Sequence, residues 1–243
     1  MAISVNTVYQ RVLGILNKEQ RGYVTAQEFN LFANQAQQDL FEQYFYDINQ
    51  FGRVPGNDTE YSDMLTLLNE KINIFETIAA PTRNAGYFIA PTDLYRLGTV
   101  VYKNTTTNSF GTSSTEQIEA ERINANEFLY INSSPLTKPT NTRPVFISNT
   151  SGIKVYANSE IDSVALVDYQ YIKKPATVNW AYQIVFNEPL YDANNSVDFE
   201  LHPADEADLV IKILELAGIL IKDLNLYQVM NQEEQETIQQ EKS

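Results

Sequence analysis

Apolar residues recur at helical spacing in the first part of the chain. Within residues 5–16 they fall at i, i+3, i+4 and i+7, which predicts an amphipathic helix with Ser4 as its N-cap. Thr25 and Glu28 have the spacing of a capping box, in which each residue's side chain bonds the backbone amide of the other. This box predicts a long helix with an apolar stripe over residues 29–48. The polar residues expected to face away from that stripe are Asn34, Gln35, Gln38, Asp39 and Glu42.

Two further helical patterns follow. A turn-rich stretch, 52–58, ends the long helix, and a weaker helical pattern runs over residues 59–75. After Pro203 a strong pattern covers residues 209–224, and it is apolar on more than one face. A helix with so wide an apolar arc is either central in a bundle or shared with a neighbouring chain. The apolar residues outside its main stripe include Ile211, Leu216 and Ile219.

The period changes between residues 81 and 191. Runs of β-branched and aromatic residues alternate there with clusters of Pro, Gly, Asn and Ser, which is typical of strands and turns. One short helix, 124–131, is expected among the strands, and Ser151-Gly152 is expected to form a turn. This spacing favours a small antiparallel sandwich or barrel. The expected strands are residues 94–103, 115–122, 145–148, 153–156 and 163–172.

Chain order is therefore helices, strands, helices, which predicts an α+β protein. We expect a helical bundle formed by the N- and C-terminal helices, with an inserted antiparallel β-sandwich or barrel domain. The expected boundaries are 1–80 for the N-terminal helical part, 81–195 for the β domain and 196–243 for the helices that complete the first part. Residues 228–243 contain too few apolar side chains to bury themselves, so we expect this tail to need contacts from neighbouring chains.

Composition removes many kinds of chemistry. The chain has no cysteine and one histidine, which excludes disulfide frameworks, thiolate nucleophiles and Cys/His zinc sites. Its formal net charge of -14 opposes binding to nucleic-acid phosphates. The apolar run 217–221 is far shorter than the roughly 18–20 residues of a membrane span, and the first residues lack the pattern of a secretory signal. We expect no membrane association, no metal and no cofactor.

The remaining candidate groups give no strong catalytic signal. No phosphate-binding glycine loop is present, and the single histidine, His202, precedes the proline of a predicted helix start, which favours a local structural role. Glu116 and Glu121 could form a glycosidase pair, but carboxylates are abundant in this chain. The sequence therefore predicts a protein without enzymatic activity. Core packing is the favoured role for the aromatic residues Tyr169, Tyr171, Trp180 and Tyr182.

Segments at both ends of the chain resemble a family of phage virion proteins. At the N-terminus these are residues 4–13, 17–23 and 27–30, and at the C-terminus residues 199–203, Glu206 and 209–218. Residues 171–175 and Trp180 look like the end of the β domain in tail-adaptor proteins. Together they resemble the head-to-tail connector or ring proteins of short-tailed, crAss-like phages.

This resemblance implies a structural subunit of an oligomeric connector ring that joins the portal to the tail and lines the DNA channel. Such rings usually hold about twelve copies, contact the portal and other tail or ring proteins, and let DNA pass without specific binding. The implied location is the virion, with assembly in the host cytoplasm. The alternative from another class is a glycan-binding or glycan-cleaving virion module. We expect the subunit and portal interface to include Ile211, Leu216, Ile219, Leu226, Val229, Met230 and Ile238.

Overall fold

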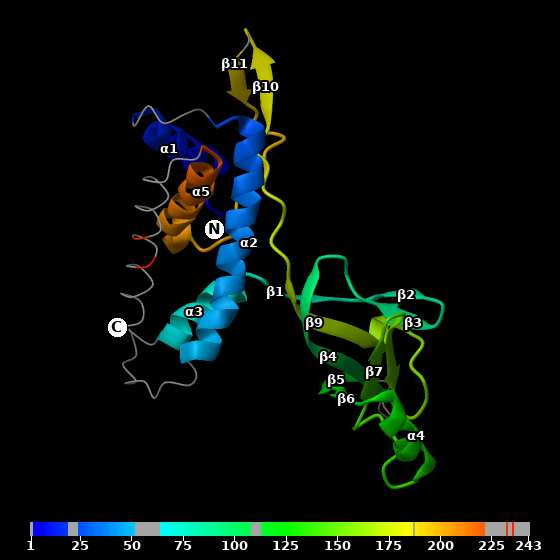
Figure 1. The fold of residues 1–243 in the computed structure, drawn as a ribbon. Coiled ribbons are helices and arrows are strands. Elements are labelled where there is room, and N and C mark those ends of the chain that lie inside the picture. The colour runs from blue at the N-terminus through cyan, green and yellow to red at the C-terminus, as the bar shows by residue number, and fades with distance from the viewer. Residues whose placement is uncertain are drawn as a thin grey trace. The chain divides into compact units, whose positions relative to one another are not determined.

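The structure, a computed structural model, describes residues 2–18, 24–51, 64–107, 113–186 and 188–221, together with residues 232 and 235. It divides into two compact units, which are described separately. The helical unit comprises Met1–Ile74 and Pro175–Ser243, and the β unit comprises Phe75–Lys174. The β unit is thus inserted between the two parts of the helical unit (Figure 1), so the predicted α+β class is confirmed.

Within the described residues, four α-helices build the helical unit. They are α1 (Val5–Lys18), α2 (Ala26–Phe51), α3 (Met64–Asn73) and α5 (Glu206–Ile221), the last preceded by the short 3-10 helix η2 (Pro203–Asp205). Helix α5 packs on α1 and α2, and α3 packs on α2, so the first and last helices share one core as expected. The side chains fully buried between them include Val5, Val12, Phe29, Ala33, Leu209 and Ile213.

Helix α2 begins at the predicted capping box. The Thr25 amide donates to Glu28 Oε2 at 2.8 Å, and the Glu28 amide donates to Thr25 Oγ1 at 3.3 Å. These bonds satisfy two amides that the first turn of a helix leaves without an intrahelical partner. They also lower the pKa of Glu28, because the carboxylate accepts hydrogen bonds from Thr25.

Two sheets form the β unit. The first has the order β1-β9-β4-β5 and the second the order β2-β3-β8-β7-β6. The first sheet consists of β1 (Glu76–Ala79), β9 (Val167–Lys173), β4 (Leu94–Thr107) and β5 (Ser113–Glu119). The second consists of β2 (Thr82–Asn84), β3 (Tyr87–Ile89), β8 (Gly152–Tyr156), β7 (Val145–Asn149) and β6 (Glu121–Arg122). Helix α4 (Ala125–Ser133) follows β6, and the 3-10 helix η1 (Val164–Leu166) precedes β9.

Both sheets contribute to one apolar core. Phe88 of β3 and Val155 of β8 pack in the same buried cluster as Val100 of β4 and Tyr169 of β9. The strand pairs are antiparallel except β6 and β7, which run parallel. The chain passes from the first sheet to the second at Ala120, between β5 and β6, and the connection through α4 is the crossover that the parallel pair needs.

The turn between β7 and β8 lies where Ser151-Gly152 predicted it. Gly152 has a φ of +132°, and a Cβ at this position would lie 2.7 Å from the Phe88 carbonyl oxygen. Both observations require glycine here, since other residues rarely adopt this backbone conformation and would collide with β3. The local sequence therefore fixes how β8 joins the second sheet.

The unit boundaries differ from the expected 81 and 195. Strand β1 lies before residue 81 and pairs with β9, which brings the start of the β unit forward to Phe75. Residues after Lys174 belong to the helical unit, including the hairpin of β10 (Tyr182–Val185) and β11 (Glu188–Tyr191). The sequence did not reveal this second boundary. Residues 175–201 are extended, as in a β domain, although they pack on helices.

Candidate functional site

Amide side chains on α2 fix the segment that leads to the β10–β11 hairpin. Asn30 accepts a hydrogen bond from the Trp180 amide at 2.8 Å and donates to the Trp180 carbonyl at 3.2 Å. Asn34 accepts from the Val178 amide at 2.8 Å and donates to the Val178 carbonyl at 2.9 Å. Asn34, which was expected to face away from the apolar stripe, thus binds an extended backbone.

Gln37 continues the same row. Its side chain donates to the Ala176 carbonyl at 2.8 Å and accepts from the Glu200 amide at 3.2 Å. Alternate residues of an extended chain lie about 6.6–6.8 Å apart, and four residues of a helix rise about 6 Å. Because these repeats nearly match, one helix face can bind every second residue of the segment. We call Asn30, Asn34 and Gln37 the amide row.

Trp180 anchors the base of the hairpin. It is 3% exposed, and its ring lies 4.1 Å from that of Tyr9, centroid to centroid. It also stacks on Tyr182 and Tyr191, the two residues at the open end of the hairpin, at 5.8 Å each. The Trp180 Nε1 group donates to Asn6 Oδ1 at 3.1 Å. The hairpin therefore starts from a fixed base on the helical unit.

The tip of the hairpin is apolar and exposed. Phe186 is 99% exposed and has a φ of +51°, a left-handed conformation that is uncommon for a bulky residue. Ile184 is 72% exposed, and Val185 and Leu190 are exposed as well. These four residues are called the hairpin patch. Glu188 is the one charged residue of the sequence from 182 to 191.

A second exposed apolar group lies on the β unit. Leu129 and Tyr130 of α4 and Leu136, which follows that helix, are strongly exposed. Thr137 ties the chain after α4 back to the helix, because its hydroxyl donates to the Ile131 carbonyl at 3.1 Å. We call Leu129, Tyr130 and Leu136 the α4 patch. It differs from the hairpin patch in residues and in supporting structure.

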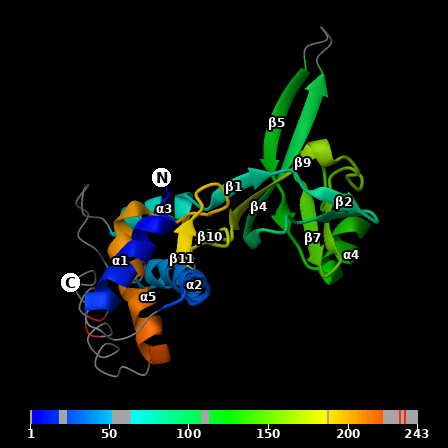
Figure 2. The same ribbon diagram turned by 90° about the horizontal axis from the view of Figure 1, so that it is seen from above.

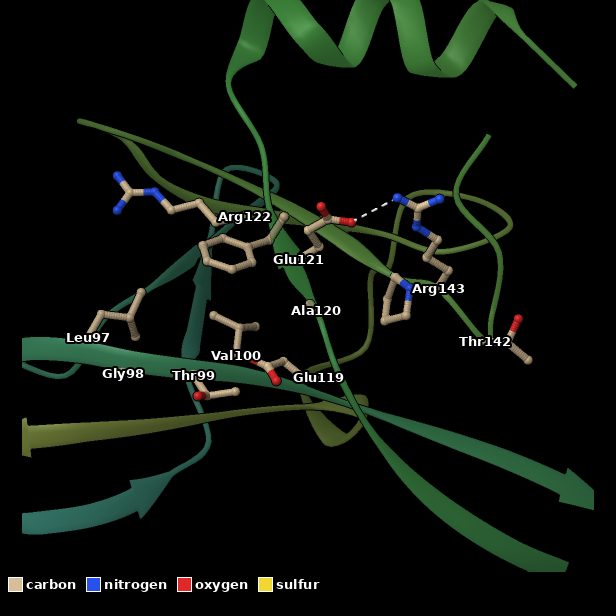
Figure 3. A pocket seen from close by; sticks show the side chains of 12 residues that line it. Leu97, Gly98, Thr99, Val100, Glu119, Ala120, Glu121, Arg122, Thr142 and Arg143 are labelled. Atoms are coloured by element: carbon tan, nitrogen blue, oxygen red, sulfur yellow. Dashed lines mark hydrogen bonds and ion pairs between the residues drawn. The ribbon is translucent and has the colours of Figure 1, made fainter. Parts of the chain in front are cut away.

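The β unit also contains a cleft of about 480 Å³. Its apolar lining includes Val100, Ala120 and Phe146, all of which are buried. Figure 3 shows the cleft beside the part of β4 that carries Leu97, Gly98 and Thr99, under the crossing from β5 to β6. A volume of this size lies within the range of about 300–1,000 Å³ that is usual for binding pockets.

The wall of the cleft is an unpaired strand edge. Strand β4 pairs with β9 from Leu94 onward, but β5 pairs only with Val101–Thr107 on the other side. The Ala120 amide donates to the Val100 carbonyl at 2.8 Å, and the chain then leaves for the second sheet. Figure 2 shows β4 and β5 as a long hairpin. Within the described parts of the chain, no strand pairs with the outer edge of residues 94–99.

Charged side chains surround this cleft. Arg143 Nη2 lies 3.1 Å from Glu121 Oε2, as the dashed line in Figure 3 marks. Arg122 points to the other side of the strand from Glu121, toward Leu97. Neither Arg122 nor the exposed Glu119 makes an ion pair with any residue that the structure describes. The cleft thus combines an apolar floor, an open strand edge and a free guanidinium.

The interface residues expected from the sequence lie elsewhere. Ile211 and Leu216 are half-buried on α5, and Ile219 lies in α5 but its side chain is not described. The others lie outside the described residues: Leu226, Val229, Met230 and Ile238. The expectation about the tail, residues 228–243, falls almost entirely outside them as well. The hairpin patch was not found from sequence, although the run Ile184-Val185-Phe186 was its signal.

The structure also places the histidine, the two glutamates and the aromatic residues that were considered as candidates. His202 is the N-cap of η2, and its Nδ1 accepts from the Ala204 amide at 3.2 Å. Glu116 lies on β5 and Glu121 lies on β6, beyond the point where the chain changes sheets, and Glu121 forms an ion pair with Arg143. Tyr169, Tyr171 and Trp180 are buried as expected, whereas Tyr182 is half-buried.

Comparisons with known proteins give no family. No protein-family model matches the chain, and no curated protein matches it. None of the helices in the described ranges is long and apolar enough to cross a membrane. The same ranges hold no group of three or more His, Cys, Asp and Glu side chains able to bind a metal ion.

Proposed function

We propose that the protein is a structural subunit of an oligomeric connector ring that joins the portal of a short-tailed phage to its tail and lines the DNA channel. The observation that supports this best is the hairpin patch. A fixed, projecting element with four exposed apolar side chains favours burial against another protein surface.

Charge supports association at this patch. Copies that each carry a net charge of -14 repel one another wherever their acidic surfaces meet. The 182–191 segment carries one charged residue, so contact there buries apolar area with little added repulsion. An acidic inner surface would also let DNA pass without adhering, since phosphates bind chiefly to Lys and Arg.

The two different patches favour a ring over a twofold dimer. A twofold dimer needs one surface that complements itself, whereas unlike surfaces make head-to-tail contacts that close when the rotation allows. The hairpin patch and the α4 patch are unlike surfaces on different units. A subunit in a stack of rings needs contacts both within its own ring and with its neighbours above or below. Two patches supply surfaces for both kinds of contact.

Sedimentation velocity of the full chain and a Phe186→Ser variant tests this proposal. We expect the wild type to form a large assembly and the variant to need at least about tenfold higher concentration to assemble. Leu31→Ser is the matched control, because Leu31 is exposed on α2 outside both patches. It should assemble as the wild type does. A wild type that stays monomeric at every concentration, or that saccharides stabilise against heat, would contradict the proposal.

A further inference from the structure

We propose that the hairpin patch of one copy inserts into the β-unit cleft of a second copy and adds a strand to the open edge of β4. This inference rests on the proposed ring function and names the two surfaces that meet within the ring. It connects a projecting element of the helical unit with a concave site of the β unit. Each copy carries one hairpin patch and one such cleft.

Backbone chemistry supports this pairing. Residues 96–99 of β4 border an edge that no described strand covers. Strands β10 and β11 pair only with each other among the described strands, so each has one free edge. Adding an extended segment to an open edge pairs the backbone groups of both partners, a recognised mode of association.

Side-chain chemistry supports the same pairing. The cleft floor of Val100, Ala120 and Phe146 is apolar, and about 480 Å³ can hold a phenyl ring and an aliphatic neighbour. Phe186 and Ile184 are the most exposed apolar residues of the hairpin. Their insertion removes the exposed apolar side chains of the hairpin from water.

Charge favours this occupant. Arg122 lies at the cleft without an ion-pair partner among the described residues, whereas Arg143 already binds Glu121. The one charged residue of the hairpin segment is Glu188, which can neutralise Arg122. Glu119 is exposed at the rim and stays hydrated there. A second copy brings the apolar tip and the required carboxylate together in one segment.

Crosslinking tests the contact directly, because the chain has no natural cysteine. An Ile184→Cys variant mixed with a Thr99→Cys variant should give crosslinked dimers with a short bismaleimide, and neither variant alone should. Replacing Thr99→Cys by Ile78→Cys supplies the control, since Ile78 is exposed on β1 and does not line the cleft. Equal crosslinking through Ile78→Cys, or crosslinking of Ile184→Cys to itself, would overturn the inference.

A charge exchange provides an independent test. Arg122→Glu and Glu188→Arg should each raise the concentration needed for assembly about tenfold, and the double variant should recover most of the loss. The pairing would be refuted if the double variant needed a concentration for assembly as high as the two single effects combined. If the wild type does not assemble at all, the ring proposal fails together with this inference. If it assembles without hairpin-to-cleft crosslinks, this inference alone fails.

Discussion

At the scale of single residues, one buried carboxylate connects three helical elements. Asp205 is 3% exposed, and its Oδ1 lies 2.7 Å from Lys71 Nζ of α3. The Tyr44 hydroxyl of α2 donates to Asp205 Oδ2 at 2.5 Å. Lys71 also lies over the Tyr44 ring, 5.5 Å from its centroid. A charge this deeply buried is tolerated because both oxygens have partners.

Removing this carboxylate should destabilise the helical unit strongly. Asp205→Ala leaves Lys71 charged and largely buried, so we expect a loss of about 3–5 kcal/mol in the free energy of unfolding by urea. Tyr44→Phe keeps the ion pair and removes one hydrogen bond, so it should cost only about 1–2 kcal/mol. An Asp205→Ala variant that loses no more than Tyr44→Phe would show that the ion pair does not hold these helices together.

A buried phenol makes the β unit sensitive to alkali. Burial raises the pKa of Tyr169 far above its ordinary value near 10, and its hydroxyl donates to the Phe88 carbonyl at 3.3 Å. Above pH 10 the unfolded chain releases this proton while the folded chain keeps it, so stability falls as pH rises. The slope is about 1.4 kcal/mol per pH unit for one group.

Tyr169→Phe should therefore flatten this decline. Urea midpoints measured from pH 9 to pH 11 should fall less steeply in the variant than in the wild type. The stability contribution of the protonated Tyr169 is fully present below pH 10, so the advantage of the wild type over the variant should be largest at pH 9 and should shrink toward pH 11. Parallel declines in both proteins would show that other groups cause the alkaline loss.

Sequence predicts residue-level contacts when the partners are close along the chain. The Thr25–Glu28 box was predicted because its partners are three residues apart and use a fixed helix geometry. The Tyr44–Asp205 bond joins residues 161 positions apart, and neither local sequence contains a sign of the other. The same holds for the position of Arg122 beside the cleft, which only the folded β unit reveals.

At the scale of elements, the amide row decides where the hairpin base lies. The bonds of the row join α2 to residues that lie between 139 and 163 positions later in the chain. Asn34 satisfies both the amide and the carbonyl of Val178, which the extended segment cannot satisfy within itself. The row therefore acts in place of a partner strand.

Asn34→Ala should loosen this attachment. It leaves two backbone groups of Val178 unpaired in a partly buried position, so we expect a cost of about 1–3 kcal/mol in thermal or urea unfolding. Gln38→Ala is the control, because Gln38 is exposed and its side chain donates to Glu42 on the same helix at 3.1 Å. Equal effects of the two substitutions would mean that the amide row contributes nothing to stability.

The strands that sequence predicted and missed differ in burial. Strands β4, β7, β8 and β9 contain buried β-branched and aromatic residues, and those runs made them recognisable. In β2 every side chain is exposed, and β10 has one half-buried residue among exposed ones, so neither has a polar–apolar pattern set by a core. The same exposure that hid β10 from the sequence analysis makes its hairpin a candidate for assembly.

At the scale of the whole molecule, the order of helices, strands and helices predicted the α+β fold. Helix α5 needs α1 and α2 to cover its wide apolar arc, which brings the two ends of the chain together. The cleft could not be foreseen, because it depends on where β5 leaves β4. The fold class can be predicted from the periodicity of apolar residues. The cleft depends on where one strand ends beside a longer neighbour, and local sequence does not show this.

Electron microscopy of the purified full-length chain tests the ring claim most directly. We expect closed rings with rotational symmetry and a central lumen. In averaged images, the β10–β11 hairpin of each copy should lie against the β unit of the next. Ring formation should not require nucleic acid or another protein. Monodisperse single subunits at high protein concentration, or closed twofold dimers without a lumen, would contradict it.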